Sequence, residues 1–221
     1  MTRGKEPKKP DKVRDAHRSK NAILRAARDL FAEHGFDGVS LNEIAGAADL
    51  SRGTPSYFFG SKEDLYAAVL QRAFEERESA TRRACEPLLV WATSEDESSI
   101  RDALINAVNG YLDFLLQHPA FLKLVLREEL AGASHLQSVP RESKAIEEAF
   151  ESLRSAASDR GLRSFDVKEA VLVFVSLTFF PAAHRSTFMA SMDKDLEDGS
   201  TRRRHVELVV TQLLFLIETP R

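Results

Sequence analysis

The sequence predicts an all-α fold. Apolar residues recur at helical spacing along most of the chain, and no convincing pair of strands is indicated. The 221 residues are 43% apolar and 29% charged, enough to bury the core of one large or two modest domains. We therefore expect a globular protein built from helices.

The first third of the chain predicts four helices, at residues 15–34, 40–48, 51–58 and 62–84. Gly35 offers the left-handed cap that commonly ends a helix. Ser40 and Glu43 have the spacing of a capping box, in which each side chain bonds the other residue's backbone N–H. Ser51 or Thr54 is expected to cap the third helix.

The rest of the chain predicts further helices, at residues 100–118, 119–130, 146–157, 167–180 and 206–217. Pro119 suits the first turn of a helix, and Asp166 with Glu169 forms another candidate capping box. The segment 167–180 is apolar nearly all round, so neighbours must cover it on more than one side.

Charge is distributed unevenly. Residues 1–62 hold twelve basic and eight acidic side chains, whereas the remainder has a net charge of −7. A basic segment on an acidic body favours a polyanion-binding region joined to a part with another role. We expect a flexible basic tail at residues 1–14, a polyanion-binding domain at 15–62 and a helical body at 63–221.

Two short helices joined by a tight turn are typical of a helix-turn-helix, although a purely structural helical corner has the same pattern. The second helix is polar, which favours DNA binding. Lys62 stands beside a helix N-terminus, where an ammonium and free N–H groups can hold a phosphate together. The candidate DNA-binding residues are Asn42, Arg52, Gly53, Thr54, Ser56, Tyr57, Phe58 and Lys62.

The region resembles the TetR-type (TetR/AcrR) bacterial transcriptional regulators. Residues 39–65 carry the resemblance with VSLNEIAGAADLSRGTPSYFFGSKEDL, preceded by EHGF at residues 33–36. Residues 111–130 are similar to a helix junction of that family. The resemblance implies about nine helices, a three-helix DNA-binding domain with its helix-turn-helix at Ser40 to Phe59, and a C-terminal ligand-binding and dimerisation domain.

The resemblance also assigns roles. It implies that residues 52–58 form the recognition helix in the major groove and that Lys62 clamps a phosphate. The chain departs from the family pattern with Asp49 in the turn, where Gly is usual, and with Ser56, where Tyr is common. Asp tolerates a left-handed turn. Pro55 is favoured if it opens the helix, which is then barely one turn long.

Side-chain chemistry suggests which groups would read DNA. Arg52 suits a bidentate contact to guanine, Asn42 an adenine or a phosphate, and Thr54 a thymine methyl. Residues 1–20 hold eight Lys or Arg against three acids, which fits either added DNA contacts or a solubilising tail.

The body is rich in phenylalanine. By the resemblance, some aromatic residues line a pocket for an apolar or planar effector, although a core stripe has the same pattern. The expected pocket residues are Phe74, Trp91, Tyr111, Phe114, Phe150 and Phe174. The last helix has more apolar surface than one neighbour can bury, which favours a two-fold homodimer. The expected interface residues are Val171, Val175, Phe179, Val209, Leu213 and Leu216.

Several protein classes are disfavoured. No common catalytic signature occurs, the six histidines lack metal-ligand spacing, and no cofactor is indicated. The single cysteine, Cys85, is interpreted as inert, with a redox sensor as the alternative. The longest apolar run, residues 170–183, is too short for a membrane helix, and no signal peptide is evident. We expect a cytoplasmic protein that is not an enzyme.

These observations predict a homodimeric repressor that binds a palindromic operator and is released by a small-molecule effector. The sequence leaves three alternatives open: an activator, a ligand-independent DNA-binding dimer, and a helical binding protein or enzyme whose N-terminal domain does not bind DNA.

Overall fold

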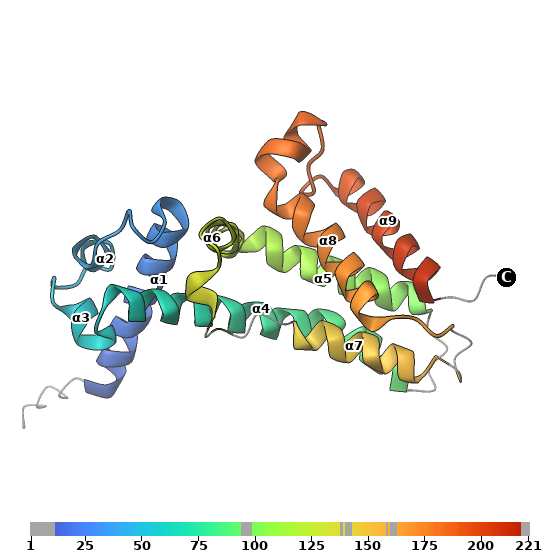
Figure 1. Ribbon diagram of the computed structural model, residues 1–221, viewed down its shortest axis with the longest axis horizontal. Coiled ribbons are helices and arrows are strands. Elements are labelled where there is room, and N and C mark those ends of the chain that lie inside the picture. Colours follow the sequence, from blue (N-terminus) through green and yellow to red (C-terminus); the bar gives the residue numbers. More distant parts are fainter. Residues whose placement is uncertain are drawn as a thin grey trace, which may run out of the picture. The chain divides into compact units, whose positions relative to one another are not determined.

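The described part of the chain is almost entirely helical, and it contains no strand. The computed structural model describes residues 12–93, 99–137, 139, 143–157, 159 and 163–217. The α-helices are α1 (Lys12–His34), α2 (Leu41–Ala47), α3 (Thr54–Phe59), α4 (Lys62–Thr93), α5 (Ile100–Gln117), α6 (Pro119–Leu130), α7 (Lys144–Ser155), α8 (Val167–Ala183) and α9 (Gly199–Ile217) (Figure 1). The predicted all-α class is confirmed.

The chain divides into two units, and the division falls inside α4. The N-terminal unit is Met1–Gln71 and the C-terminal unit is Arg72–Arg221. The sequence placed this boundary at residue 62. The start of α4 belongs to the first unit because Leu65 and Tyr66 are buried there, with the Tyr66 ring 4.8 Å from that of Phe31 in α1.

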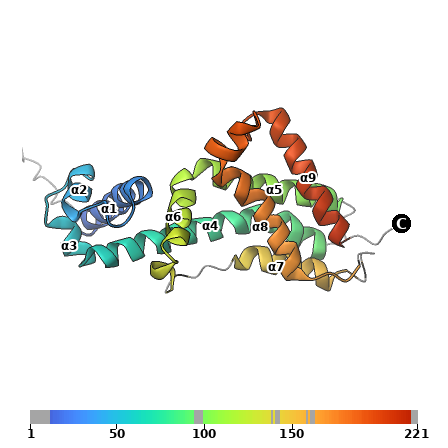
Figure 2. The same ribbon diagram turned by 45° about the horizontal axis from the view of Figure 1, so that its top comes forward.

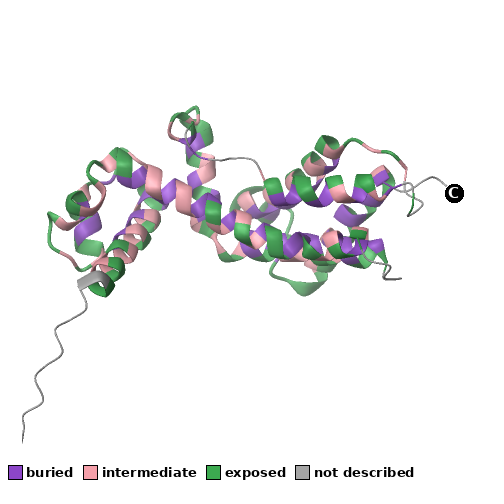
Figure 3. Cartoon of the chain, turned by 90° about the horizontal axis from the view of Figure 1, so that it is seen from below, coloured by how far each residue is buried: buried purple, intermediate pink, exposed green. Residues whose placement is uncertain are grey.

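The helices of the N-terminal unit pack around a small apolar core. Amphipathic α1 contacts α2 and α3, and its buried stripe is Ile23, Ala27 and Phe31. Figure 3 shows this alternation of buried and exposed positions along the helices. Residues 1–11 of the expected tail lie outside the described residues, and Lys12 to Arg14 already belong to α1.

The C-terminal unit is organised around α8. This helix contacts α5, α6, α7 and α9, as the prediction of cover on several sides requires (Figures 1 and 2). Its buried residues include Phe174 and Thr178. Leu172 nevertheless keeps 58% of its surface exposed, so the protomer leaves part of α8 uncovered.

Three local features differ from the prediction. Helix α4 continues to Thr93 through Pro87, which is expected to cost a hydrogen bond, and the buried Leu88 and Trp91 supply the packing that offsets this cost. A π-helix, η2 (Arg185–Met189), follows α8, and a 3₁₀-helix, η1 (Ser134–Leu136), follows α6. The break expected near Gly161 lies outside the described residues.

Candidate DNA-binding interface

Helix α2 begins with the predicted capping box. The Ser40 hydroxyl accepts the Glu43 N–H at 3.3 Å, and the Glu43 carboxylate accepts the Ser40 N–H at 2.7 Å. These bonds satisfy two backbone donors that a helix start leaves unpaired. Ile44 and Ala45 face the core, whereas Asn42 is exposed.

The turn between α2 and α3 depends on Asp49. Asp49 stands where the resembled family usually has glycine, and its φ of 55° lies in the left-handed region. Asp tolerates this conformation, as expected. The Asp49 N–H donates to Gly46 O at 3.1 Å, and the Leu50 N–H donates to Ala45 O at 2.9 Å. The turn is therefore closed by backbone bonds.

Helix α3 starts differently from the prediction. Gly53 occupies the cap position, and neither the Ser51 nor the Thr54 side chain caps the helix by accepting a backbone N–H. Instead, the hydroxyls of Ser51 and Thr54 bond each other at 2.6 Å. Pro55 lies in the first turn, where its missing N–H costs nothing, and it is buried. The resulting six-residue helix is as short as expected.

The outer surface of α3 and of the two residues before it is polar and aromatic. Arg52, Gly53 and Ser56 are exposed, and Tyr57 keeps 83% of its surface exposed. Thr54 and Phe58 are half-buried. Within the described residues, no hydrogen bond or ion pair engages the Arg52 guanidinium. Arg52 and Tyr57 therefore present donors and an aromatic edge to the solvent.

Lys62 has a partner inside the unit. Its Nζ donates to Phe36 O at 3.1 Å and lies 4.3 Å from the centre of the Phe36 ring. This contact ties the start of α4 to the segment after α1. An ammonium has three donors, so the expected phosphate contact of Lys62 stays a prediction.

A second capping box, which the sequence analysis did not predict, begins α4. The Ser61 hydroxyl accepts the Asp64 N–H at 3.0 Å, and the Asp64 carboxylate accepts the Ser61 N–H at 3.1 Å. The signal was present as a Ser followed three residues later by an acid.

These capping carboxylates predict a loss of stability in acid. Bonds from the Ser40 side chain and backbone hold the pKa of Glu43 below its ordinary 4.5, and bonds from Ser61 hold that of Asp64 below 3.8. Bonds from Ser200 and Thr201 lower the pKa of Asp198, which caps α9, to about 2. Because these folded-state pKa values are lowered, the stabilisation is complete above the ordinary values and is lost as pH falls through the lowered ones.

We therefore expect the backbone amide signals of Glu43, Asp64 and Thr201, followed by NMR during acid titration, to shift below about pH 4.5. The S40A variant should move the transition at Glu43 to higher pH, towards its ordinary value, and leave that at Thr201 unchanged. An unchanged Glu43 transition in S40A would show that the Ser40 hydroxyl does not lower this pKa.

The expected effector residues all lie inside the C-terminal unit. Their rings pack together: Phe74 on Phe121, Tyr111 on Phe114 and Phe174, and Phe150 on Phe174, with centroid distances of 5.6 to 6.5 Å. Trp91 is also buried. Phe114 lines a pocket of about 390 Å³ with residues of α4 and with His118. The effector role of these residues stays a prediction.

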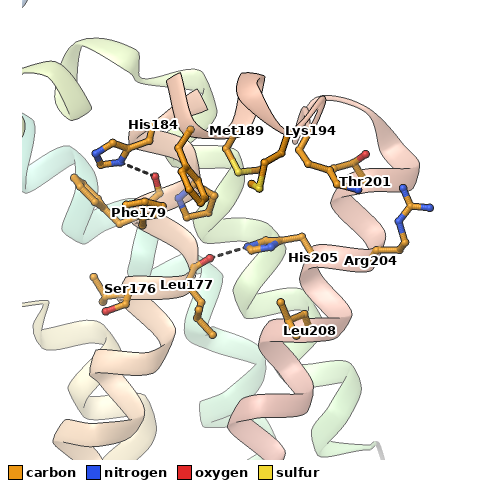
Figure 4. Close-up of a pocket in the computed structure, with 15 residues that line it drawn as sticks. Ser176, Leu177, Phe179, His184, Met189, Lys194, Thr201, Arg204, His205 and Leu208 are labelled. Atoms are coloured by element: carbon orange, nitrogen blue, oxygen red, sulfur yellow. Dashed lines mark hydrogen bonds between the residues drawn. The ribbon is translucent and has the colours of Figure 1, made fainter. Parts of the chain in front are cut away.

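A larger groove, of about 840 Å³, lies between α8, η2 and α9. Figure 4 shows Ser176 and Phe179 of α8, and His184 just after it, on one side of the groove, and Arg204, His205 and Leu208 of α9 on the other. The His205 ring bonds Leu177 O at 2.7 Å across the groove. Apolar residues line most of it, and the expected effector residues are not among them.

The structure places the expected dimer residues on two faces. Val171, Val175, Phe179 and Leu216 are half-buried. Val209 and Leu213 have no exposed surface, so this part of the prediction is corrected: they pack inside their own protomer. Five other apolar residues of α8, η2 and α9 are exposed: Leu172, Phe180, Phe188, Leu208 and Phe215. Leu208 and Phe215 are seven residues apart, so they lie two turns apart on one face of α9.

Cys85 does not fit a redox sensor. It is buried, and burial raises the pKa of its thiol to about 12. The thiolate is the reactive form, so the inert interpretation is favoured.

Metal sites and membrane spans have no candidates among the described residues. No group of three or more His, Cys, Asp or Glu side chains there is arranged to hold a metal ion. None of the helices in this part of the chain combines the length and the apolar character needed to cross a membrane.

Curated relatives match over much of the chain. It is 27% identical over 196 residues to the HTH-type transcriptional repressor NicS of Pseudomonas putida, covering 86% of this chain and 88% of NicS. It is 31% identical over 137 residues to the HTH-type transcriptional regulator RutR of Escherichia coli, covering 60% of this chain and 58% of RutR.

Solved structures share the fold. A TetR family transcription regulator from Marinobacter aquaeolei matches with a TM-score of 0.65 at 18% identity, covering 95% of this chain and all of that one. A candidate TetR-family regulator from Mesorhizobium loti matches with a TM-score of 0.68 at 19% identity, covering 92% of this chain and 98% of that one.

Two family models match separate parts of the chain. The model described as "Bacterial regulatory proteins, tetR family" matches residues 23–69, which contain the helix-turn-helix. The model described as "Tetracyclin repressor-like, C-terminal domain" matches residues 101–212, about half of the chain. The chain therefore belongs to the TetR family and is a DNA-binding transcriptional regulator.

Proposed function

We propose that this protein is a homodimeric cytoplasmic repressor that binds a palindromic operator and leaves it when a small molecule binds the C-terminal unit. The observation that carries the proposal is the exposed surface of α3. Arg52, in the turn just before α3, and Tyr57, within the helix, are exposed, and backbone hydrogen bonds close that turn. Groups presented in this way are available to base edges and phosphates.

The buried side of α3 supports the same role. Pro55 anchors the helix to the core, and the Ser51 and Thr54 hydroxyls bond each other at its start. A recognition element has to be held rigidly if its contacts are to discriminate between bases. The recognition helix is only six residues long, so we expect each half-site to be read over few base pairs.

Dimerisation follows from the uncovered face of the C-terminal unit. Family members typically dimerise, and the exposed Phe180 of α8 and Leu208 of α9 line the same groove. A two-fold dimer uses one patch on both subunits and so matches a palindromic operator with half-sites about 34–36 Å apart.

Repression and effector release are supported by the relatives. NicS, which aligns with most of the chain, is a repressor by its name. Family members typically bind effectors in the domain that residues 101–212 match. A ligand that binds one arrangement of the dimer better than another shifts the half-site spacing, with a coupling of about 1–3 kcal/mol.

Selection of binding sites from random duplex DNA tests the proposal. We expect enrichment of a palindrome, whose half-site spacing identifies the dimer geometry. If nothing is enriched, mass spectrometry of the denatured protein shows whether an effector was bound. Failure of effector-free protein to enrich any site would overturn the proposed function.

A further inference from the structure

We infer that the groove between α8, η2 and α9 binds an amphipathic anion, whose charged group is held by Lys194 and Arg204 and whose hydrocarbon part lies against the apolar walls. This inference rests on the proposed function, in which a small molecule binds the C-terminal unit. It assigns that molecule a site, which the sequence placed elsewhere, and a chemical class.

The groove has the size of a ligand site. Its volume of about 840 Å³ lies within the range of about 300–1,000 Å³ that small-molecule pockets have. Its walls come from α8, η2, α9 and the segment between the last two, all within the C-terminal unit. The π-helix η2 belongs to a rare type of turn that is frequent at functional sites.

The walls are apolar and accessible to a ligand. The Phe180 ring stacks on His184 with centroids 4.3 Å apart, and it packs on Phe188 at 5.3 Å. The accessible apolar side chains of the groove are Phe180, Phe188, Met192 and Leu208, which keep between 45% and 51% of their surfaces exposed. A hydrocarbon chain that covers this concave surface removes apolar area from water on both partners.

One end of the groove is cationic. Figure 4 shows Lys194, Thr201 and Arg204 at this end and Ser176 and Phe179 at the other. No hydrogen bond or ion pair engages the Lys194 or Arg204 side chain within the described chain. None of the described residues that line the groove is Asp or Glu. Two available cations beside an apolar wall therefore complement a molecule with an anionic head and an apolar tail.

The acids near this end have other roles. The Asp198 carboxylate accepts the Thr201 N–H at 2.7 Å and so caps α9. Glu197 accepts a hydrogen bond from Arg185 at 3.0 Å. No acid of residues 193–198 lines the groove. The charge of Lys194 and Arg204 is therefore available to an anion from outside the chain.

The position of the groove links the ligand to the proposed subunit contact. Phe180 and Leu208 line the groove and are also exposed apolar residues of the face on which we place that contact. A ligand that covers them changes the surface that a second copy meets. The ligand shifts the dimer as far as it binds one arrangement better than the other.

Methionine NMR tests the site directly. The chain has three methionines, of which Met189 and Met192 line the groove and Met1 belongs to the N-terminal unit. Protein with ¹³C-labelled methionine methyl groups is titrated with octanoate, decanoate and the neutral 1-decanol, all below micellar concentrations. We expect decanoate to shift the Met189 and Met192 signals and leave that of Met1 in place. Decanoate should bind more tightly than octanoate, by up to about four-fold for each additional buried methylene.

Two charge-matched variants test the cationic end. K194Q/R204Q should bind decanoate about 10-fold to 100-fold more weakly and bind 1-decanol as the wild type does, because only the anion loses charged hydrogen-bond partners. K168Q/R203Q removes the same charge from exposed positions of α8 and α9 outside the groove and should leave both affinities unchanged. Circular dichroism and thermal melts establish that both variants are folded.

Two results would overturn the inference. Undiminished decanoate affinity in folded K194Q/R204Q would show that these cations hold no anionic group. Met189 and Met192 signals that respond to protein concentration but not to decanoate would assign the groove to a second copy of the chain. Neither titration contains DNA, so both results leave the proposed DNA recognition intact, whereas failure of the wild-type protein to select any DNA sequence overturns the proposed function itself.

Discussion

Replacement of Arg52 by alanine is expected to weaken operator binding by roughly 30-fold to 10⁴-fold, since each half-site loses about 1–3 kcal/mol and the dimer has two. The fold should be unaffected, because Arg52 is exposed and makes no hydrogen bond or ion pair with another described residue. Affinity for a random-sequence duplex should fall much less, since the substitution removes only an electrostatic attraction there.

Fluorescence anisotropy with the selected operator and a random-sequence duplex measures both affinities. R154A is the matched control, because Arg154 is an exposed arginine of α7 in the other unit. An equal loss on both DNAs would assign Arg52 to a phosphate and contradict base reading. No loss on either would remove α3 from the interface.

Local sequence patterns predicted the helix-turn-helix well because its geometry is local. The capping box of Ser40 and Glu43 and the left-handed turn at Asp49 each depend on residues within a few positions of one another. The junction of α5 and α6 at Pro119 was predictable for the same reason.

Contacts between distant segments were not predictable in this way. The Nζ of Lys62 bonds the carbonyl of Phe36, twenty-six positions earlier, and no local spacing indicates such a pair. The continuation of α4 beyond Pro87 is another example, because tertiary packing of the buried Trp91 stabilises that last part of the helix. Propensity alone ends the helix before that proline.

The apolar helices of the body show a third limit. Helix α9 has apolar residues on more than one side, so periodicity does not tell which side faces the protomer's own core. The buried residues are Val209 and Leu213, whereas Leu208 and Phe215 face outward with 51% and 74% of their surfaces exposed. Only the packing of α9 on α5 and α8 resolves this choice.

The outward face of α9 leads to the prediction with the largest expected effect. The L208E/F215E variant should be monomeric, because a two-fold interface places four new carboxylates in an apolar contact, where burial of unpaired charge costs several kcal/mol. Val209 and Leu213 remain buried on the other side of the helix, so the protomer should stay folded.

Loss of the dimer should also weaken operator binding. A monomer engages one half-site, and affinity is expected to fall towards the non-specific level, by about 10³-fold or more. Sedimentation velocity measures the association state, and anisotropy measures operator affinity on the same samples.

L130E/V90E provides the control, because Leu130 and Val90 are also exposed apolar residues, with 90% and 47% of their surfaces exposed, but neither lies on α8 or α9. This variant should stay dimeric and bind the operator normally. A dimeric L208E/F215E protein would place the subunit contact elsewhere. A monomer with undiminished operator affinity would separate DNA recognition from two-fold symmetry, so the pair of measurements tests whether the uncovered face of α9 sets the spacing of the two recognition helices.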